Sequence, residues 1–185
     1  MVICQFISPW RHVVLVALLW LGVGASAADS SGWIPLFDGQ SLAGWKAGGN
    51  PGGFKVVDGT IAFDGRRSHL FYDGKVCGAD FKNFELKAEV HTKPLANSGI
   101  YFHTAYQEKD FPEQGFEVQV ANTHVGAGGY VEMKKTGSLY GVRNVHRQLV
   151  KDNEWFALHI SVRGNRIQVR LNDCLLYTSP SPRDS

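Results

Sequence analysis

Apolar and polar residues alternate with a period of two along most of the chain. In "FELKAEV" (84–90) every second residue is apolar, and "WFALHISVRGNRIQVRL" (155–171) repeats the pattern on both sides of a Gly-Asn turn. "FKVVDGTIAF" (54–63) does so around an Asp-Gly turn. Such alternation is typical of half-buried β-strands, and these turns favour hairpins. The sequence therefore predicts an all-β fold of short antiparallel strands.

No stretch shows a helical period of useful length, and glycines separate the apolar runs. Short strands at regular spacing with turn residues between them favour a sandwich or a barrel. We favour a jelly roll, in which the inner faces of two sheets form the core and a concave outer face can hold a ligand.

The N-terminal segment has the pattern of an export signal. Arg11 and His12 precede the apolar run 13–21, and "ASA" at 25–27 supplies the small residues of a cleavage site. A signal peptide over residues 1–27 is predicted, with a secreted or periplasmic mature chain that begins near Ala28. A single-pass anchor is the alternative, although the run is short for a membrane span.

The C-terminal segment 174–185, "CLLYTSPSPRDS", does not continue the alternation before it. We expect it to be a disordered or non-native tail. The remaining residues, 28–173, are enough for one domain with a core of its own. Inside this domain, 105–114 and 122–138 are expected to be long loops.

Charge and cysteine content exclude some functions. The net charge is +2, and it falls to +1 when residues 1–27, which contain one basic residue and no acid, are removed. No basic stripe interleaves with aromatic residues, so we expect no nucleic acid partner. A nearly neutral surface suits an uncharged substrate. Cys77 and Cys174 alone would make no disulfide framework.

The segments 97–104 and 115–121 carry polar residues opposite their apolar set. Tyr101 and His103 share one side of the first segment, and Glu117 and Gln119 share one side of the second. If the two strands are neighbours, a phenol, an imidazole, a carboxylate and an amide converge on one surface. A simpler interpretation is that any exposed strand turns polar residues outward and that a histidine at a strand end is structural.

Four common motifs of catalytic, metal and phosphate sites are absent from the sequence. There is no G-x-S-x-G elbow, no H-E-x-x-H, no Cys-x-x-Cys and no phosphate-binding loop. The residues by themselves indicate only an exported β-sandwich with one polar face.

A set of motifs in fixed order nevertheless resembles a known family. The motifs "WIPLFDGQSLAGWK", "FKNFELKAEV", "ANSGIYFHT", "GFEVQVANTH", "KTGSLYG" and "DNEWFALHISVRGNRIQVRLN" together resemble the 3-keto-disaccharide hydrolase domain over residues 32–173. The resemblance implies a concanavalin-like jelly roll that acts on a carbohydrate. It also implies 3-keto-glucoside 1,2-lyase or 3-keto-2-hydroxyglucal hydratase activity.

The resemblance also suggests site residues. It implies that His103, Glu117 and His124 are candidate bases, acids or metal ligands. The candidate substrate contacts are Asn97, Tyr101, Gln119, Lys135 and Tyr140. The cofactor stays open, with a divalent metal ion as one way to stabilise an enolate.

The chain departs from the family pattern in two places. Phe116 stands where a tyrosine is expected, and the strands that normally close the domain do not follow residue 173. The sequence therefore predicts a C-terminally truncated sandwich.

Two other functions compete with an enzyme. One is a non-catalytic carbohydrate-binding module on the same fold, and the other is a domain that binds a protein. A binding module should carry a row of exposed aromatic residues, whereas an enzyme needs a carboxylate and an imidazole in a pocket. The ionisable and amide residues of 97–124 favour the enzyme.

Overall fold

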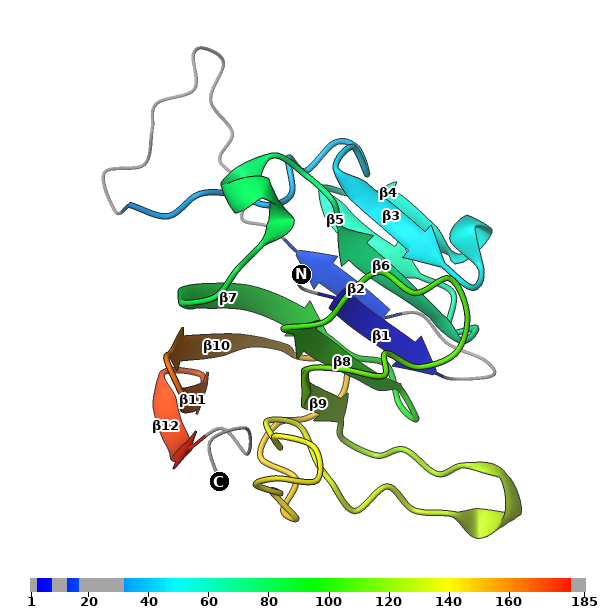
Figure 1. The fold of residues 1–185 in the computed structure, drawn as a ribbon. Helices are drawn as coiled ribbons and strands as arrows, with labels where there is room; N and C mark the ends of the chain where they lie inside the picture. The colour runs from blue at the N-terminus through cyan, green and yellow to red at the C-terminus, as the bar shows by residue number, and fades with distance from the viewer. Residues whose placement is uncertain (1–2, 8–12, 17–31, 181–185) are drawn as a thin grey trace.

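The computed structural model describes residues 3–7, 13–16 and 32–180, and it is a sandwich of two antiparallel sheets (Figure 1). The five-stranded sheet has the order β3 (Trp45–Gly48), β6 (Ser68–Tyr72), β1 (Ile3–Ile7), β8 (Asn97–Phe102) and β9 (Phe116–Ala121). The seven-stranded sheet has the order β12 (Cys174–Pro180), β11 (Arg166–Leu171), β10 (Trp155–Arg163), β7 (Phe84–His91), β2 (Val13–Val16), β5 (Thr60–Phe63) and β4 (Phe54–Val57). The predicted all-β sandwich is confirmed.

The connections contain only short helical turns in the described part of the chain. These are the 3₁₀ turns η1 (Pro51–Gly53), η2 (Val76–Ala79) and η3 (Ala127–Gly129). No helix among the described residues has the length and apolar character needed to cross a bilayer.

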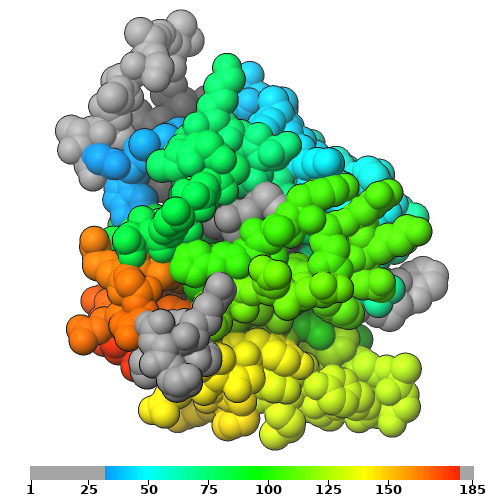
Figure 2. Space-filling view, in the orientation of Figure 1, coloured from blue at the N-terminus to red at the C-terminus, as the bar shows by residue number. Residues whose placement is uncertain are grey.

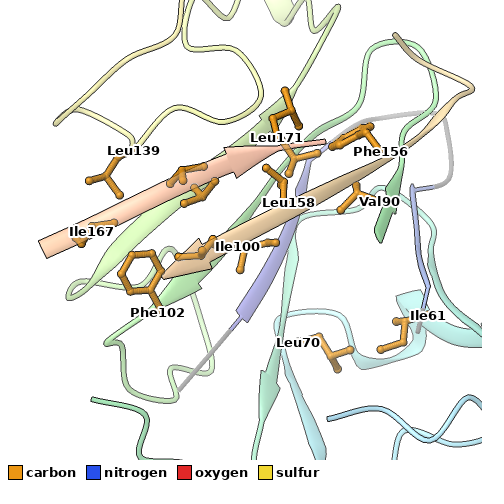
Figure 3. Close-up of a cluster of buried hydrophobic side chains, with 14 of the residues drawn as sticks. Ile61, Leu70, Val90, Ile100, Phe102, Leu139, Phe156, Leu158, Ile167 and Leu171 are labelled. Atoms are coloured by element: carbon orange, nitrogen blue, oxygen red, sulfur yellow. The ribbon is translucent and has the colours of Figure 1, made fainter. Parts of the chain in front are cut away.

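The core lies between the two sheets, where the apolar set of each strand points inward. Figure 3 shows Leu70 and Ile100 of one sheet and Leu158 and Ile167 of the other within one cluster of buried side chains. All four are at most 2% exposed. Because successive side chains of a strand point to opposite faces, residues 69, 71, 99, 101, 117 and 119 point out of the core. Tyr101 of β8 and Glu117 and Gln119 of β9 therefore share the outer face of the five-stranded sheet.

The predicted hairpins are present. β4 and β5 join through Asp58 and Gly59, whose φ angles of 49° and 72° are left-handed, and Val57 pairs with Thr60. β10 and β11 join through Gly164, with Arg163 paired to Arg166. Asp, Asn and Gly tolerate this backbone conformation at low cost, which fixes the register of both hairpins.

Two stretches of the predicted export signal form strands in the uncleaved chain. β1 lies between β6 and β8 in one sheet, and β2 lies between β5 and β7 in the other. In the uncleaved chain, residues 3–7 and 13–16 thus belong to the sheets, because Val, Ile and Phe have high β-propensity. The predicted cleavage point at 25–27 lies outside the described residues. Cleavage there would remove one strand from each sheet.

The predicted disordered tail is wrong for residues 174–180. They form β12, which pairs antiparallel with β11 across a register shift between Val169 and Arg170. The turn before β12 consists of Asn172 and Asp173 with φ angles of 47° and 64°, so it needs no glycine. Tyr177 is 8% exposed and belongs to the core. Residues 181–185 lie outside the described residues.

Tyr177 provides a test of β12. Its hydroxyl donates a 2.7 Å hydrogen bond to the buried carbonyl of Gly137. Tyr177→Phe should lower the free energy of unfolding by about 1–2 kcal/mol, because the carbonyl loses its partner. Urea unfolding measures this, with Leu175→Ala as a control because Leu175 is 47% exposed. If Tyr177→Phe left the free energy of unfolding unchanged, this would mean that β12 is not held in place in solution.

Candidate functional site

A pocket of about 920 Å³ opens on the outer face of β8 and β9. Its floor is formed by the outward residues of the two strands, and its walls come from segments 103–115 and 122–145. In Figure 2 these segments, green and yellow-green to yellow, lie side by side on the face toward the viewer. The lining residues are Asn97, Tyr101, Phe111, Pro112, Glu113, Gln114, Gly115, Phe116, Glu117, Gln119, Tyr130, Glu132, Tyr140 and Val142.

Strand pairing places Glu117 at the centre of the floor. Tyr101 is its cross-strand partner, and Gly99 pairs with Gln119. The Glu117 side chain lies over Gly99: a β-carbon built on Gly99 would come within 2.7 Å of its Cγ and 2.8 Å of its Cδ. The missing side chain at Gly99 is therefore what makes room for the carboxyl group.

The Glu117 carboxyl group is hydrogen-bonded within this floor. The Tyr101 hydroxyl donates to it. The Gln119 side chain is best oriented with its nitrogen 2.9 Å from Glu117 Oε1 and 3.0 Å from the Ser98 carbonyl, so that it donates to both. The other end of the Gln119 amide meets the side-chain amide of Asn97 at 3.0 Å. These contacts fix the direction in which the carboxyl group points.

Burial raises the pKa of Glu117 to about 7. The hydrogen bond from Tyr101 opposes this rise, the negative charge of Glu132 adds to it, and the positive charge of Lys134 again opposes it. Burial also raises the pKa of Tyr101, with the charge of Glu117 adding to the effect. Near neutral pH, Glu117 can thus accept or donate a proton, while Tyr101 stays a hydrogen-bond donor.

Backbone hydrogen bonds attach the wall 122–145 to the free edge of β9. The Gln119 N–H donates to the Ser138 carbonyl, and the Gly137 N–H donates to the Gln119 carbonyl, both at 2.9 Å. The Tyr140 N–H donates to the Glu117 carbonyl, also at 2.9 Å. These bonds hold the aromatic ring of Tyr140, a predicted substrate contact, at the pocket wall.

His103 does not share this face, and the prediction that it does is wrong. Its φ of 55° ends the strand alternation directly after Phe102. The His103 Nε2 lies 3.0 Å from the carbonyl of Lys82, and its ring contacts Phe84 and Phe116. The imidazole therefore lies at the edge of the core rather than in the pocket.

His124 and Lys135 also lie outside the pocket lining. His124 is buried, and its Nδ1 is 2.9 Å from the Leu95 carbonyl. The Lys135 N–H donates to the Val145 carbonyl at 2.8 Å. The lysine beside the pocket is its neighbour Lys134, whose Nζ lies 4.3 Å from the centre of the Tyr140 ring. Asn97, Tyr101, Glu117, Gln119 and Tyr140 are the predicted residues that the structure brings together.

Sequence reasoning missed His69, which lies on the same outer face in β6. It is 3% exposed, and its ring packs edge-on against Tyr101 and Phe111, with centres 5.9 Å away in each case. Its buried Nε2 has no hydrogen-bond partner in the structure described. Burial lowers the pKa of His69 to about 4, so the ring is neutral at pH 7. In "SHLFY" His69 is next to the apolar Leu70, and this alternation could have placed His69 on the outer face.

The buried His69 predicts a pH dependence of stability. Its pKa in the folded protein is below the ordinary 6.5, so the unfolded chain binds more protons between pH 4 and pH 6.5. The fold should therefore lose stability as the pH falls through this window. Between pH 7 and pH 5, the unfolding free energy of the wild type should fall by about 2 kcal/mol relative to His69→Gln.

Urea unfolding at the two pH values measures this difference. His146→Gln is the matched control, because His146 is exposed. If the wild type and His69→Gln changed equally with pH, His69 would not be held neutral by burial.

The described residues do not form an evident metal site. Among 3–7, 13–16 and 32–180, no three His, Cys, Asp or Glu side chains are grouped closely enough to hold an ion. The pocket lining offers three carboxyl groups, of which Glu117 has a raised pKa, together with three phenols and three side-chain amides, and the ammonium group of Lys134 lies nearby.

Comparison with known proteins adds a family match. The model of a family described as the 3-keto-alpha-glucoside-1,2-lyase-like domain matches residues 32–184, a range that includes β12. A curated 3-keto-disaccharide hydrolase of Bacteroides thetaiotaomicron is 35% identical over 81 residues, which are 40% of this chain and 28% of the relative. The match thus spans less than a third of that relative's length.

Solved structures share the fold. A candidate glycosyl hydrolase of Parabacteroides distasonis superposes with a TM-score of 0.61 at 22% identity, over 80% of this chain and 72% of that one. A second candidate glycosyl hydrolase of the same organism gives a TM-score of 0.53 at 23% identity, over 74% and 72%. These similarities support the β-sandwich architecture.

Proposed function

Because this chain belongs to the 3-keto-alpha-glucoside-1,2-lyase-like domain family, we propose that it is an enzyme acting on 3-keto-glycosides. The reaction would be β-elimination of the glycosidic bond, hydration of the resulting 3-keto-2-hydroxyglucal, or both. The observation that carries this proposal is Glu117, a carboxyl group with a pKa of about 7 on the floor of a pocket large enough for a sugar.

The chemistry requires a base of this kind. A ketone at C3 of the sugar acidifies the hydrogen on C2, and a base removes it while the electron pair moves onto the ketone oxygen. When the pair returns, the bond between C1 and the glycosidic oxygen breaks, and that oxygen takes up a proton. Water then adds across the C1=C2 bond, so that the net reaction is hydrolysis. A base with a pKa near the working pH is the most effective.

The pocket residues divide these roles. Glu117 is the base that faces the C2 hydrogen. The Tyr101 hydroxyl and the Gln119 amide donate to this carboxyl group and hold it in position. The Asn97 amide in the pocket lining can donate to a sugar oxygen, and a preorganised donor of this kind stabilises an enolate. Lys134 supplies a positive charge that acts on the carboxyl group. None of these roles needs the imidazoles of His103 or His124.

A carbohydrate-binding module remains the second candidate, and one observation favours it. Aromatic side chains stand at the pocket mouth: Phe111 is 42% exposed, Tyr130 52% and Tyr140 41%. Exposed aromatic rings can stack on sugar rings. The enzyme is the stronger candidate because simple sugar binding does not require a buried carboxyl group of raised pKa.

Incubation with 3-keto-trehalose and simple 3-keto-glucosides tests the proposal. In D₂O, the enzyme should exchange the C2 hydrogen for deuterium and release the aglycone, both of which NMR detects. The same assay with a chelator shows whether a metal ion takes part. Saturable sugar binding without exchange or release would instead identify a binding module.

The proposed location is the periplasm or the extracellular space. Its support is the order of basic residue, apolar run and small residues in 11–27. N-terminal sequencing of the protein recovered outside the cytoplasm should begin near Ala28.

A further inference from the structure

A second carboxylate, Glu132, lines the same pocket from the wall 122–145. Its residue is only 3% exposed, which is rare for a glutamate without compensating contacts. No motif in the sequence indicates it, and the proposed chemistry does not use it as a base. Its burial therefore needs an explanation.

The Glu132 side chain is hydrogen-bonded and ion-paired by several groups. The Tyr130 hydroxyl donates to its Oε2 at 2.9 Å, and the Lys134 N–H donates to its Oε1 at 2.8 Å. The Lys134 Nζ lies 3.9 Å from the same Oε1 and is in turn hydrogen-bonded to Tyr140. A buried charge is retained when it is paired and hydrogen-bonded in this way. The wall therefore presents a fixed negative charge next to a fixed positive one.

Glu117 faces charged and titratable groups from every element around it. Tyr101 faces it from β8. The wall contributes Tyr130, Glu132, Lys134 and Tyr140, and Glu113 stands at the exposed rim. Of these described groups, only Glu132 and Lys134 combine a full charge with a partly or fully buried position. Charges in such positions are screened less than the exposed Glu113. Their effects on the pKa of Glu117 are opposite: Glu132 raises it and Lys134 lowers it.

We propose that Glu132, with its partner Lys134, is a positioning element of this site that acts through Glu117 and decides the pH at which the site can remove a proton. Its consequence for turnover rests on the proposed function, whereas its effect on Glu117 does not. The two charges come from one short segment, so a shift of that segment would alter both effects together.

The titration of Glu117 tests this directly. ¹³C NMR of protein labelled at the glutamate carboxyl groups follows Glu117, with Glu117→Gln identifying its signal. Glu132→Gln keeps the shape and one acceptor oxygen but removes the charge, and it should lower the midpoint by about half to one pH unit. Lys134→Met should raise the midpoint by a similar amount. The control Glu113→Gln should leave it within about a quarter of a unit.

The pH dependence of kcat/KM should shift in the same direction as the NMR midpoint of each variant. The acid limb should move to lower pH in Glu132→Gln and to higher pH in Lys134→Met. If neither variant moved the NMR midpoint, the inference would be wrong. If Glu132→Gln does not fold, an unchanged midpoint in Lys134→Met overturns it equally. Shifted midpoints in a protein without turnover would reject the proposed function and leave the electrostatic role of the pair standing.

Discussion

Glu117→Gln should lower kcat/KM on a 3-keto-glycoside by about 10²-fold or more and should also make the protein more stable above pH 7. The loss follows because glutamine cannot accept the C2 proton. The gain in stability follows from the raised pKa of Glu117. Glu117 has a pKa of about 7 in the folded protein and 4.5 ordinarily, so the folded protein binds more protons between these values. Stability therefore falls as the pH rises through this window.

The variant lacks this penalty, since its side chain never ionises. At pH 8 its free energy of unfolding should exceed that of the wild type by about 1–3 kcal/mol, and below pH 4 the two should be equal. Urea unfolding at both pH values and initial rates measure the two effects. Glu113→Gln, at the exposed rim of the same pocket, is the matched control. It should change the free energy of unfolding and kcat/KM only slightly.

Two results would count against this account. Full activity in Glu117→Gln would reject its role as the base, and His69, the neutral imidazole on the same outer face, would become the next candidate. A variant that is less stable than the wild type at pH 8 would show that the carboxylate is stabilised in the pocket rather than strained by burial.

Gly99→Ala should reduce activity almost as far as Glu117→Gln, although residue 99 carries no chemistry. The new methyl group would come within 2.7 Å of the Glu117 Cγ, closer than real side chains approach. Glu117 must then leave its position, and overpacking of this kind costs about 1–3 kcal/mol of stability. Gly52→Ala is the control, because nothing closer than 4.0 Å faces a β-carbon there.

The double variant separates displacement from general damage. If the added methyl group acts only by moving the carboxyl group, Gly99→Ala combined with Glu117→Gln should be about as active as Glu117→Gln alone. A further loss of tenfold or more in the double variant would mean that Gly99 matters for another reason, such as the backbone position of β8.

The alternation of residues predicted most of the fold, and its failures have identifiable causes. The tail strand β12 follows a turn of Asn172 and Asp173. These two polar residues look like the start of a loop, but both tolerate the left-handed backbone conformation that a tight turn requires. The strands β1 and β2 come from an apolar segment whose composition fits an export signal and a buried strand equally well. Pattern alone does not distinguish these uses.

The site was predictable where it lies on strands and unpredictable where it lies on loops. Parity placed Tyr101, Glu117 and Gln119 on one face, and the pairing of β8 with β9 brings them together. The parity of residue numbers does not predict the position of His103, because the backbone at that residue is left-handed and the strand has ended. In the segment 122–145 there is no period, so nothing in the sequence distinguishes Lys134 from Lys135 as the residue beside the pocket.

The hydrogen bonds between β9 and the wall 122–145 also affect how molecules meet in solution. β9 ends its sheet, and an open edge strand can pair with a strand of another molecule and start aggregation. Here the Gln119 N–H and carbonyl and the Glu117 carbonyl are already bonded to residues 137–140. The opposite edge strand, β3, is only four residues long and carries Lys46, which discourages such pairing. Loosening this wall would therefore endanger solubility as well as the pocket, because it would uncover the strand that holds the carboxyl group.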